Sequence, residues 1–300
     1  MTTADQFATA TQIAELIAQH QRLSEQIALM SSKLAIVESA VIRNPIYVAE
    51  GLNTVLHMGG WGWPIALPTT HAGVFRDYYC AGLHTVEPGV RAYLLRETPA
   101  DKIAIDIGAH IGLHAVALGY KVREKGRLIL FEPNPEMVAC LQLTLLMNGL
   151  TNCAVLEQAA VCDHPGRALF SRAAHSPESS LYRTDTIATK DTIEVATVSL
   201  DSYFAPGAQI GMIKIDAEGA EPAILRGMTR VMTENPGLKI VMEFAPEHLR
   251  RANEDPGSVL ASIASRGFRV RLVEDPEGEA KEINADALLQ RTTSNICLER

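Results

Sequence analysis

Beyond residue 100, short apolar runs alternate with longer segments in which apolar residues recur at helical spacing. The short runs predict buried strands at 102–107, 127–132, 154–158, 210–216 and 238–244. The helix after the second run is expected to have Asn134 as its N-cap and Pro135 in its first turn, and to end at Asn148 and Gly149. Repeated strand and helix units predict an α/β fold with a mainly parallel sheet covered on both faces.

Two more apolar runs lie at the end of the chain, at 268–275 and 294–300, with a turn expected at 276–278. No long helical pattern separates them, so they are predicted to add antiparallel strands to the sheet.

A different pattern fills residues 10–42, where apolar residues repeat every seven positions without an interrupting Gly or Pro. One set of seam positions holds Ile13, His20, Ile27, Leu34 and Val41, and the other holds Leu16, Leu23, Met30 and Val37. This narrow stripe predicts a coiled-coil helix that joins subunits into a homo-oligomer, with a dimer favoured over a trimer. The alternative is an amphipathic helix that packs on its own subunit, which usually carries a wider apolar stripe.

Between these patterns, residues 44–98 show no regular period and contain both tryptophans, Trp61 and Trp63. Aromatic rings could line a substrate cleft, or the segment could be a linker that packs against its neighbours. The chain is therefore divided into an oligomerisation helix at 1–43, a linker or cap at 44–98, and an α/β domain at 99–300.

The composition and charge of the chain limit the classes of partner and the cellular location that we expect. The formal net charge of −8 and the absence of a Lys/Arg-rich run argue against nucleic acid as the main partner. The five cysteines are widely spaced without a CxxC pair, which is typical of reduced core thiols. No basic and apolar leader and no uncharged span of about 20 apolar residues is found, so a cytoplasmic location without a membrane span is expected.

The first α/β turn reads DIGAHIG and differs from the G-x-G-x-x-G fingerprint that holds a pyrophosphate. Asp106 enters this turn and would repel a pyrophosphate, but it suits a ligand with a sulfonium or ammonium charge. Glu132 ends the second strand, where it could accept hydrogen bonds from two ribose hydroxyls. Together, Asp106 and Glu132 favour S-adenosylmethionine over NAD as the ligand. Taken alone, the DIGAHIG turn could instead be a structural glycine turn whose Asp caps a helix.

Several motifs occur in one order along the chain: IDIGAHIG, LFEPNPEMVACLQLTLLMNGL, LEQAAVCDHPGRALF, SSLYR, TVSLDSY and IKIDAEGAEPAILRGM. In this order they resemble the FkbM family of S-adenosylmethionine-dependent methyltransferases, over roughly residues 87–244. The resemblance implies a Rossmann-like class I methyltransferase fold with a seven-stranded sheet. It also implies O-methylation, often of a sugar, glycan or natural-product hydroxyl, so the expected partner is a small-molecule or glycan acceptor.

The resemblance also implies which residues contact the cofactor. His110 stands where the family commonly has Asn. Apart from the resemblance, Glu87 lies ahead of the first strand and is a further candidate contact for the cofactor's amino group. Ser179 and Ser180 would bind the cofactor or close over it, unless they belong to a solvated loop. The implied contacts are Asp106, Gly108, His110 and Gly112 in the turn to the methionine half, Glu132 to the ribose, Asn134 to the ribose or adenine edge, and Ala159 or Ala160 beside the adenine.

Methyl transfer to a hydroxyl requires a general base, or a metal that lowers the pKa of the hydroxyl. Asp216 ends the fourth strand and is the favoured base or metal-orienting residue. Glu218 follows it and Glu243 ends the fifth strand, and both would support it. His248 is an alternative base, and Glu221 is expected to be a first-turn helix charge. A divalent metal such as Mg²⁺ is left open as a second cofactor.

Other functions fit the sequence less well. A nucleic-acid methyltransferase usually carries an Asn/Asp-Pro-Pro-aromatic motif where this chain has IKIDAEGAE. A catalytically inactive, methyltransferase-like coiled-coil scaffold is the alternative from another class, and the intact Asp106, Glu132 and Asp216 argue against it. A methyltransferase acting on another small molecule also stays open.

Overall fold

The computed structural model describes residues 46–49, 54–58, 62–68, 82–173, 179–182 and 189–300. The chain divides into two compact units, Met1–Pro45 and Ile46–Arg300, and the described residues all belong to the second. The predicted coiled coil lies outside them, and so do Trp61 and Cys80.

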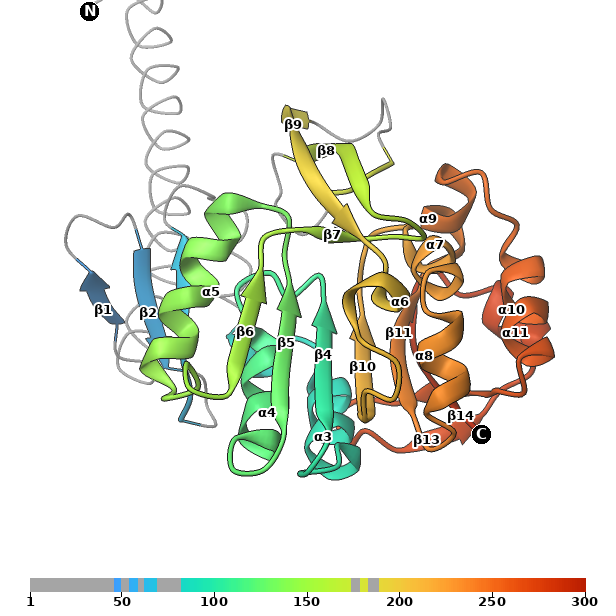
Figure 1. The fold of residues 1–300 in the computed structure, drawn as a ribbon, viewed down its shortest axis with the longest axis horizontal. Helices are drawn as coiled ribbons and strands as arrows, with labels where there is room; N and C mark the ends of the chain where they lie inside the picture. The colour runs from blue at the N-terminus through green and yellow to red at the C-terminus, as the bar shows by residue number, and fades with distance from the viewer. Residues whose placement is uncertain (1–45, 50–53, 59–61, 69–81, 174–178, 183–188) are drawn as a thin grey trace, which may run out of the picture. The chain divides into compact units, whose positions relative to one another are not determined.

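The second unit is built on an eight-stranded sheet with the order β13-β12-β14-β11-β10-β4-β5-β6 (Figure 1). The run from β11 to β6 pairs in parallel, while β14, β12 and β13 pair antiparallel. The bounds are β4 Ile103–Ile107, β5 Arg127–Phe131, β6 Ala154–Glu157, β10 Ile210–Ile215, β11 Lys239–Phe244, β12 Arg269–Val273, β13 Ala280–Glu282 and β14 Ser294–Glu299.

This topology confirms the α/β class and the antiparallel C-terminal addition, and it corrects the expected seven strands to eight in a mixed sheet. The additional strand is β13, whose three residues, AKE, are too short and too polar to give an apolar signal.

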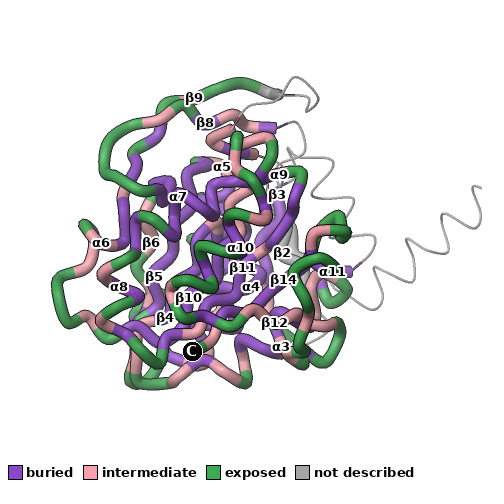
Figure 2. The backbone as a smooth tube through the Cα atoms, turned by 90° about the vertical axis from the view of Figure 1, so that its right-hand side faces the viewer, coloured by how far each residue is buried: buried purple, intermediate pink, exposed green. Residues whose placement is uncertain are grey.

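Helices cover both faces of the sheet and bury two separate apolar clusters. Along β4 the side chains alternate, so Ala104 joins one cluster while Ile105 joins the other. The first cluster includes α3 (Pro88–Glu97), α4 (Leu113–Val122) and α5 (Pro135–Met147). The second includes α7 (Glu221–Arg226), α8 (Thr229–Glu234), α9 (Pro246–Arg251), α10 (Pro256–Ser265) and α11 (Ala285–Leu289). Figure 2 shows the central strands as the most continuously buried part of the chain.

The helix α5 begins as its sequence predicts. The Asn134 side chain accepts a hydrogen bond from the Glu136 N–H at 3.1 Å, and Pro135 occupies the first turn. This N-cap fixes where the chain leaves β5, and it therefore fixes the position of Glu132 two residues earlier.

The segment expected to be irregular forms a three-stranded antiparallel sheet of β1 (Ile46–Ala49), β2 (Thr54–Met58) and β3 (Pro64–Pro68). It packs on α5, where the Ala66 N–H donates to the Thr144 hydroxyl at 3.0 Å. Trp63 stacks on Tyr120 of α4 with ring centroids 4.9 Å apart. The described part of this segment is therefore packed against the α/β domain, and Trp63 contributes to that packing.

A second three-stranded sheet, ordered β7-β9-β8, is inserted between β6 and β10. Its strands are β7 (Ala160–Val161), β8 (Gly166–Ala173) and β9 (Thr189–Val198), and a short helix α6 (Leu200–Tyr203) leads from it to β10. In Figure 1 it lies beyond the carboxyl ends of β4, β5 and β6. The sequence did not predict it, because β8 combines polar and partly exposed residues.

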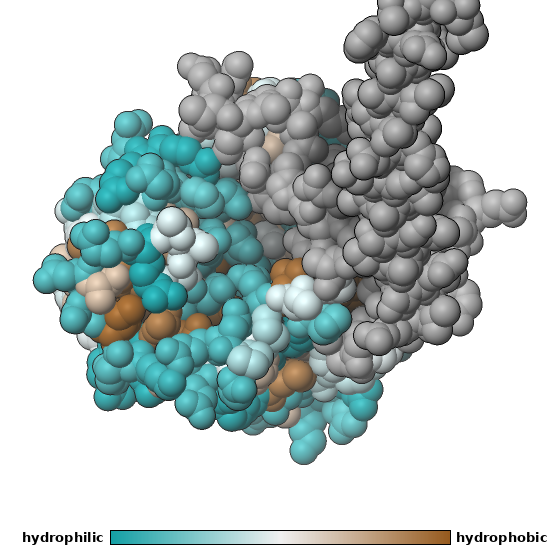
Figure 3. All heavy atoms as spheres, turned by 180° about the vertical axis from the view of Figure 1, so that it is seen from behind, coloured by the Kyte–Doolittle hydropathy of each residue, from teal (hydrophilic) through white to brown (hydrophobic). Residues whose placement is uncertain are grey.

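The described residues on the face shown in Figure 3 are mostly hydrophilic, with separate hydrophobic patches. Among the described residues, the helices are too short or too polar to span a bilayer.

Candidate functional site

A cavity of about 250 Å³ opens at the carboxyl ends of the parallel strands. Its walls come from the turn after β4, the ends of β5 and β11, the connection from β6 to β7, and the turn after β10. Open parallel sheets bind ligands at this edge, because the loops that leave neighbouring strands diverge there.

The turn after β4 is folded tightly against the turn after β10. The N–H groups of Gly108 and Ala109 both donate to the Phe131 carbonyl, at 3.0 and 3.1 Å. Gly108 has φ +76°, and a Cβ at this position would lie 1.8 Å from the carbonyl oxygen of Asp216. Only glycine fits there. Gly108 thus lets the backbones of the turns after β4 and β10 approach each other.

The other glycine of the motif does not line the cavity. Gly112 is the N-cap of α4 with φ +94°, and a Cβ there would lie 2.7 Å from Leu141 Cδ1. Its place is the packing of α4 against α5. His110 does line the cavity, in the left-handed backbone region with φ +50°.

Glu132 lies at the end of β5, with 5% of its surface exposed in the cavity wall. One carboxylate oxygen accepts the His110 N–H and the other accepts the Asn134 N–H, both at 2.8 Å. Burial raises the pKa of Glu132 to about 7, and the two backbone hydrogen bonds only partly offset this effect. The turn after β4 therefore holds the carboxylate rigidly at the edge of the cavity.

Asp106 lies beneath the cavity rather than in its wall, with 1% of its surface exposed. Its register partner on β10 is Lys214, whose Nζ lies 3.8 Å from Asp106 Oδ1 and 3.1 Å from Asp216 Oδ2. Neither oxygen of Asp106 makes a hydrogen bond among the described residues. Burial raises the pKa of Asp106 to about 6. The carboxylate is thus held by charge, through the buried ammonium group of Lys214.

Three carboxylates line the opposite wall: Asp216, Glu218 and Glu243. Glu218 has a left-handed backbone with φ +53°, and burial together with Asp216 and Glu243 raises its pKa to about 9. His248 lies behind them, with Nδ1 3.1 Å from Glu218 Oε2 and 3.5 Å from Glu243 Oε2. The structure therefore brings together the predicted catalytic carboxylates and the alternative base.

The remaining predicted residues divide into two groups. Asn134, Ala159, Ala160 and Ser179 line the cavity. Ser180 is buried outside the lining, and its hydroxyl donates to the Glu218 carbonyl at 2.8 Å and accepts the Tyr182 N–H at 3.0 Å. Ser180 therefore ties the small sheet to the turn that carries Glu218.

Glu221 closes that turn. It begins α7, and its carboxylate accepts the N–H groups of Ala217 and Gly219 at 2.9 and 3.0 Å. Its charge belongs to the first turn of the helix, as expected, and its two bonds hold the loop between Asp216 and Glu218 in place.

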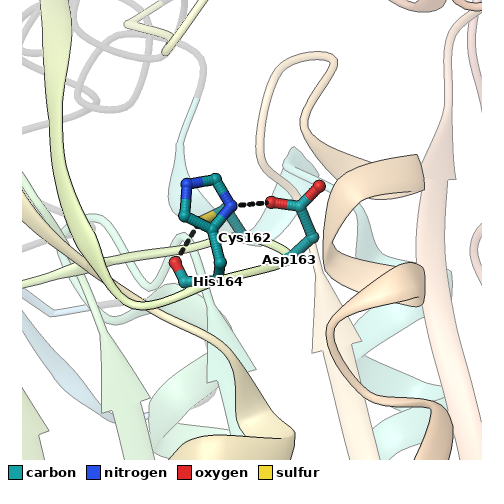
Figure 4. Close-up of side chains that lie close together, drawn as sticks. All are labelled: Cys162, Asp163 and His164. Atoms are coloured by element: carbon teal, nitrogen blue, oxygen red, sulfur yellow. Dashed lines mark hydrogen bonds and ion pairs between the residues drawn. The ribbon is translucent and has the colours of Figure 1, made fainter.

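A second group of polar side chains, Cys162, Asp163 and His164, lies outside the cavity (Figure 4). His164 Nδ1 is 2.5 Å from Asp163 Oδ1, and the Cys162 thiol donates to the His164 carbonyl at 3.0 Å. Cys162 and the other cysteines in the described part of the chain are buried. This agrees with the expected core positions.

The family model described as the methyltransferase FkbM domain matches residues 106–270, which contain every carboxylate of the cavity walls except Glu87. The chain belongs to the FkbM methyltransferase family.

The FkbM chain is also similar to a curated relative, the hexuronic acid methyltransferase AglP of Haloferax volcanii. The two are 25% identical over 148 residues, which is 49% of this chain and 58% of that protein. The chain therefore matches a little over half the length of this relative.

Solved methyltransferase structures resemble it more distantly. Precorrin-6y C5,15-methyltransferase from Geobacter metallireducens is 13% identical, with a TM-score of 0.39, and the match covers 70% of this chain and 85% of that one. TYW2 from M. jannaschii, solved in complex with AdoMet, is 10% identical, with a TM-score of 0.43 and coverage of 84% and 90%.

Two residues at this FkbM site, Lys214 and Asn295, were not predicted from the sequence. Lys214 reads as an interruption of an apolar strand, although its spacing of two residues from Asp216 places both side chains on one side of the extended chain. Asn295 of β14 donates to Glu87 Oε1 at 2.7 Å, and Glu87 Oε2 lies 3.6 Å from His114 Nε2. The strand pattern around Lys214 could have revealed it, whereas Asn295 lies 208 residues from Glu87 and has no local signal.

The buried carboxylates predict how stability depends on pH. The pKa is about 7 for Glu132 and Glu221 and about 9 for Glu218, against an ordinary value of 4.5. The folded chain therefore binds more protons than the unfolded chain from about pH 4.5 to about pH 9, so its free energy of unfolding falls as the pH rises. We expect these three groups together to cost roughly 5 kcal/mol of unfolding free energy between pH 6 and pH 8 without ligand, measured by urea denaturation.

Glu132→Gln should reduce that loss, because the substitution removes one of the titrating groups. A free energy of unfolding that increases from pH 6 to pH 8 would contradict the raised pKa values of these carboxylates.

Proposed function

We propose that the chain is an S-adenosylmethionine-dependent O-methyltransferase that acts on a hydroxyl of a sugar, glycan or natural-product acceptor. The observation that carries this proposal is that Glu132 and Asp216 line the same cavity. Glu132 lies in one wall and Asp216 lies in another, at the carboxyl end of a different parallel strand. Membership of the FkbM family supports methyl transfer, and the relative named for hexuronic acid supports a sugar acceptor.

The residues of the cavity fit S-adenosylmethionine. Glu132 offers carboxylate oxygens to ribose hydroxyls, and Gly108 lets the cavity-lining turns after β4 and β10 pack closely together. Glu87 brings a carboxylate to the cavity wall and Asp106 lies beneath it beside Lys214, and these carboxylates suit the ammonium and sulfonium charges of the cofactor. When bound, the cofactor supplies an activated methyl group. The same negative charge disfavours the pyrophosphate of NAD.

The wall opposite Glu132 supplies the proton acceptor. We assign Asp216 as the base that takes the proton of the acceptor hydroxyl, because it lines the cavity and directly follows β10. Lys214 Nζ holds Asp216 Oδ2 at 3.1 Å and so fixes the orientation of the carboxylate. Holding the hydroxyl and the methyl group in line provides much of the remaining acceleration.

The test is an incubation of the full chain with methyl-labelled S-adenosylmethionine and a panel of nucleotide sugars, free uronic acids and neutral sugars. The proposal predicts a methylated product whose label survives mild alkali, as an ether does and a methyl ester does not. A label that alkali removes would assign the reaction to a carboxylate and overturn methylation of a hydroxyl. Absence of transfer to every acceptor, with S-adenosylmethionine bound, would favour an inactive scaffold.

We also propose that the enzyme is cytoplasmic and assembles through residues 1–43. A chain that begins at Asn44 should sediment as a monomer, whereas the full chain should sediment as a dimer, with a trimer as the alternative. Leu23→Asp, in the predicted seam, should dissociate the full chain, and Ser32→Asp, on the opposite side of the heptad, should not. An unchanged oligomeric mass in the shortened chain would show that the heptad packs on its own subunit.

A further inference from the structure

We propose that Glu218, Glu243 and His248 form a binding site for a hard divalent cation, Mn²⁺ or Mg²⁺, next to the cofactor cavity. This inference rests on the proposed function for its purpose, which is to hold an acceptor oxygen. Cation binding itself is independent of that function and can be measured separately.

The three side chains converge from different elements. Glu218 comes from the turn after β10, Glu243 from the end of β11, and His248 from α9. One ligand atom from each of the three residues lies within 4.8 Å of the other two, close enough to share one ion. Two carboxylate oxygens and one imidazole nitrogen are a donor set that suits Mn²⁺, and Mg²⁺ with lower affinity.

The imidazole nitrogen gives evidence beyond the two acids. His248 Nδ1 is sealed from solvent and faces both carboxylates at 3.1 and 3.5 Å, yet it makes no hydrogen bond of good geometry among the described residues. A buried polar atom without such a bond is unfavourable, and coordination of a cation would satisfy it. His248 Nδ1 therefore has the position and the unsatisfied bonding capacity that are expected of a metal ligand atom.

Other contacts hold two of the ligands in position. The Thr293 hydroxyl donates to Glu243 Oε1 at 3.0 Å, which leaves Oε2 directed to the cluster. The Ser180 hydroxyl holds the Glu218 backbone at 2.8 Å. Neighbouring side chains thus hold two of the three ligands in position, and such support favours specific binding of a cation.

The charge around the cluster favours a cation. Asp216 and Glu221 raise the negative potential at Glu218 and Glu243, and Arg251 is the positive group beside them, with Nη2 3.4 Å from Glu218 Oε2. His248 is neutral when it coordinates, so the three ligands and Arg251 carry a net charge of about −1.

The position of the cluster indicates what the ion would do. Glu218 and Glu243 line the cavity beside Asp216, so an ion there could also bind the acceptor oxygen whose proton Asp216 receives. A bound cation lowers the pKa of such a hydroxyl. The acceptor class consistent with this arrangement carries neighbouring oxygens that can chelate the ion, as a sugar diol or a uronic acid does.

The test is a titration of the EDTA-treated full chain with Mn²⁺, followed by the electron paramagnetic resonance signal of the free ion. Wild type should bind Mn²⁺ saturably at one site, and Mg²⁺ should displace it. His248→Gln and Glu243→Gln should each weaken Mn²⁺ binding about tenfold or more. Glu247→Gln removes a charge next to His248 from an exposed side chain that pairs with Arg250 at 2.6 Å, and it should bind like wild type.

His248 lies outside the cavity wall, so its variant should keep wild-type affinity for S-adenosylmethionine, which shows that it is folded. No saturable Mn²⁺ binding by the wild type, or equal binding by wild type, His248→Gln and Glu243→Gln, would overturn the cation site. Because cofactor affinity and methyl transfer are measured apart from Mn²⁺ binding, either result leaves the proposed function to stand or fall on its own test.

Discussion

Asp216→Asn is expected to reduce turnover by roughly 10²-fold to 10⁴-fold, because the amide keeps the shape of the side chain but cannot accept the proton of the acceptor hydroxyl. The variant should fold and should bind S-adenosylmethionine nearly as wild type does, since Asp216 is assigned to the acceptor. The measurement is single-turnover transfer of a labelled methyl group at saturating cofactor.

Asp101→Asn is the matched control, since Asp101 is an exposed aspartate just before β4. It should keep wild-type turnover. If Asp216→Asn also keeps near-wild-type turnover, Asp216 is removed from the mechanism.

Glu132→Ala is expected to weaken S-adenosylmethionine binding by about 1.5 to 3 kcal/mol, because charge-assisted hydrogen bonds to the ribose are lost. This corresponds to an affinity roughly 10-fold to 150-fold lower. The substitution also removes the acceptor for the His110 and Asn134 N–H groups, so the turn after β4 should lose order. Isothermal titration calorimetry measures the affinity.

Glu157→Ala provides the comparison. Glu157 ends the neighbouring strand β6, outside the cavity wall, and accepts the Tyr203 hydroxyl at 2.8 Å. It should bind the cofactor with wild-type affinity even if its stability falls. Equal cofactor affinity for Glu132→Ala and wild type would remove Glu132 from the ribose site.

The central strands could be predicted because burial on both faces leaves a continuous apolar run. In β4 and β10, for example, nearly every side chain is buried. The small sheet of β7, β8 and β9 could not, because its strands pair with one another beyond the main sheet and leave residues such as Leu169 exposed. The local pattern of apolar residues predicts strands that are buried in a core, but it is a weak predictor of strands that lie over a binding site.

The same contrast holds at the site. Glu132 and Asp216 follow apolar strands directly, so topology brings them to one edge of the sheet. The contact of Ser180 with the Glu218 carbonyl could not be predicted, because it depends on how a loop folds over a distant turn. Asp106 was placed at the correct strand end, but its burial beneath Lys214 depends on the register of β4 with β10.

The central claim is that the cavity between Glu132 and Asp216 binds S-adenosylmethionine. Calorimetric titrations of the full wild-type chain with S-adenosylmethionine and with NAD, in the same buffer, test it most directly. The account predicts saturable binding of S-adenosylmethionine and no measurable binding of NAD. Equal affinity for the two ligands, or binding of NAD alone, would contradict it.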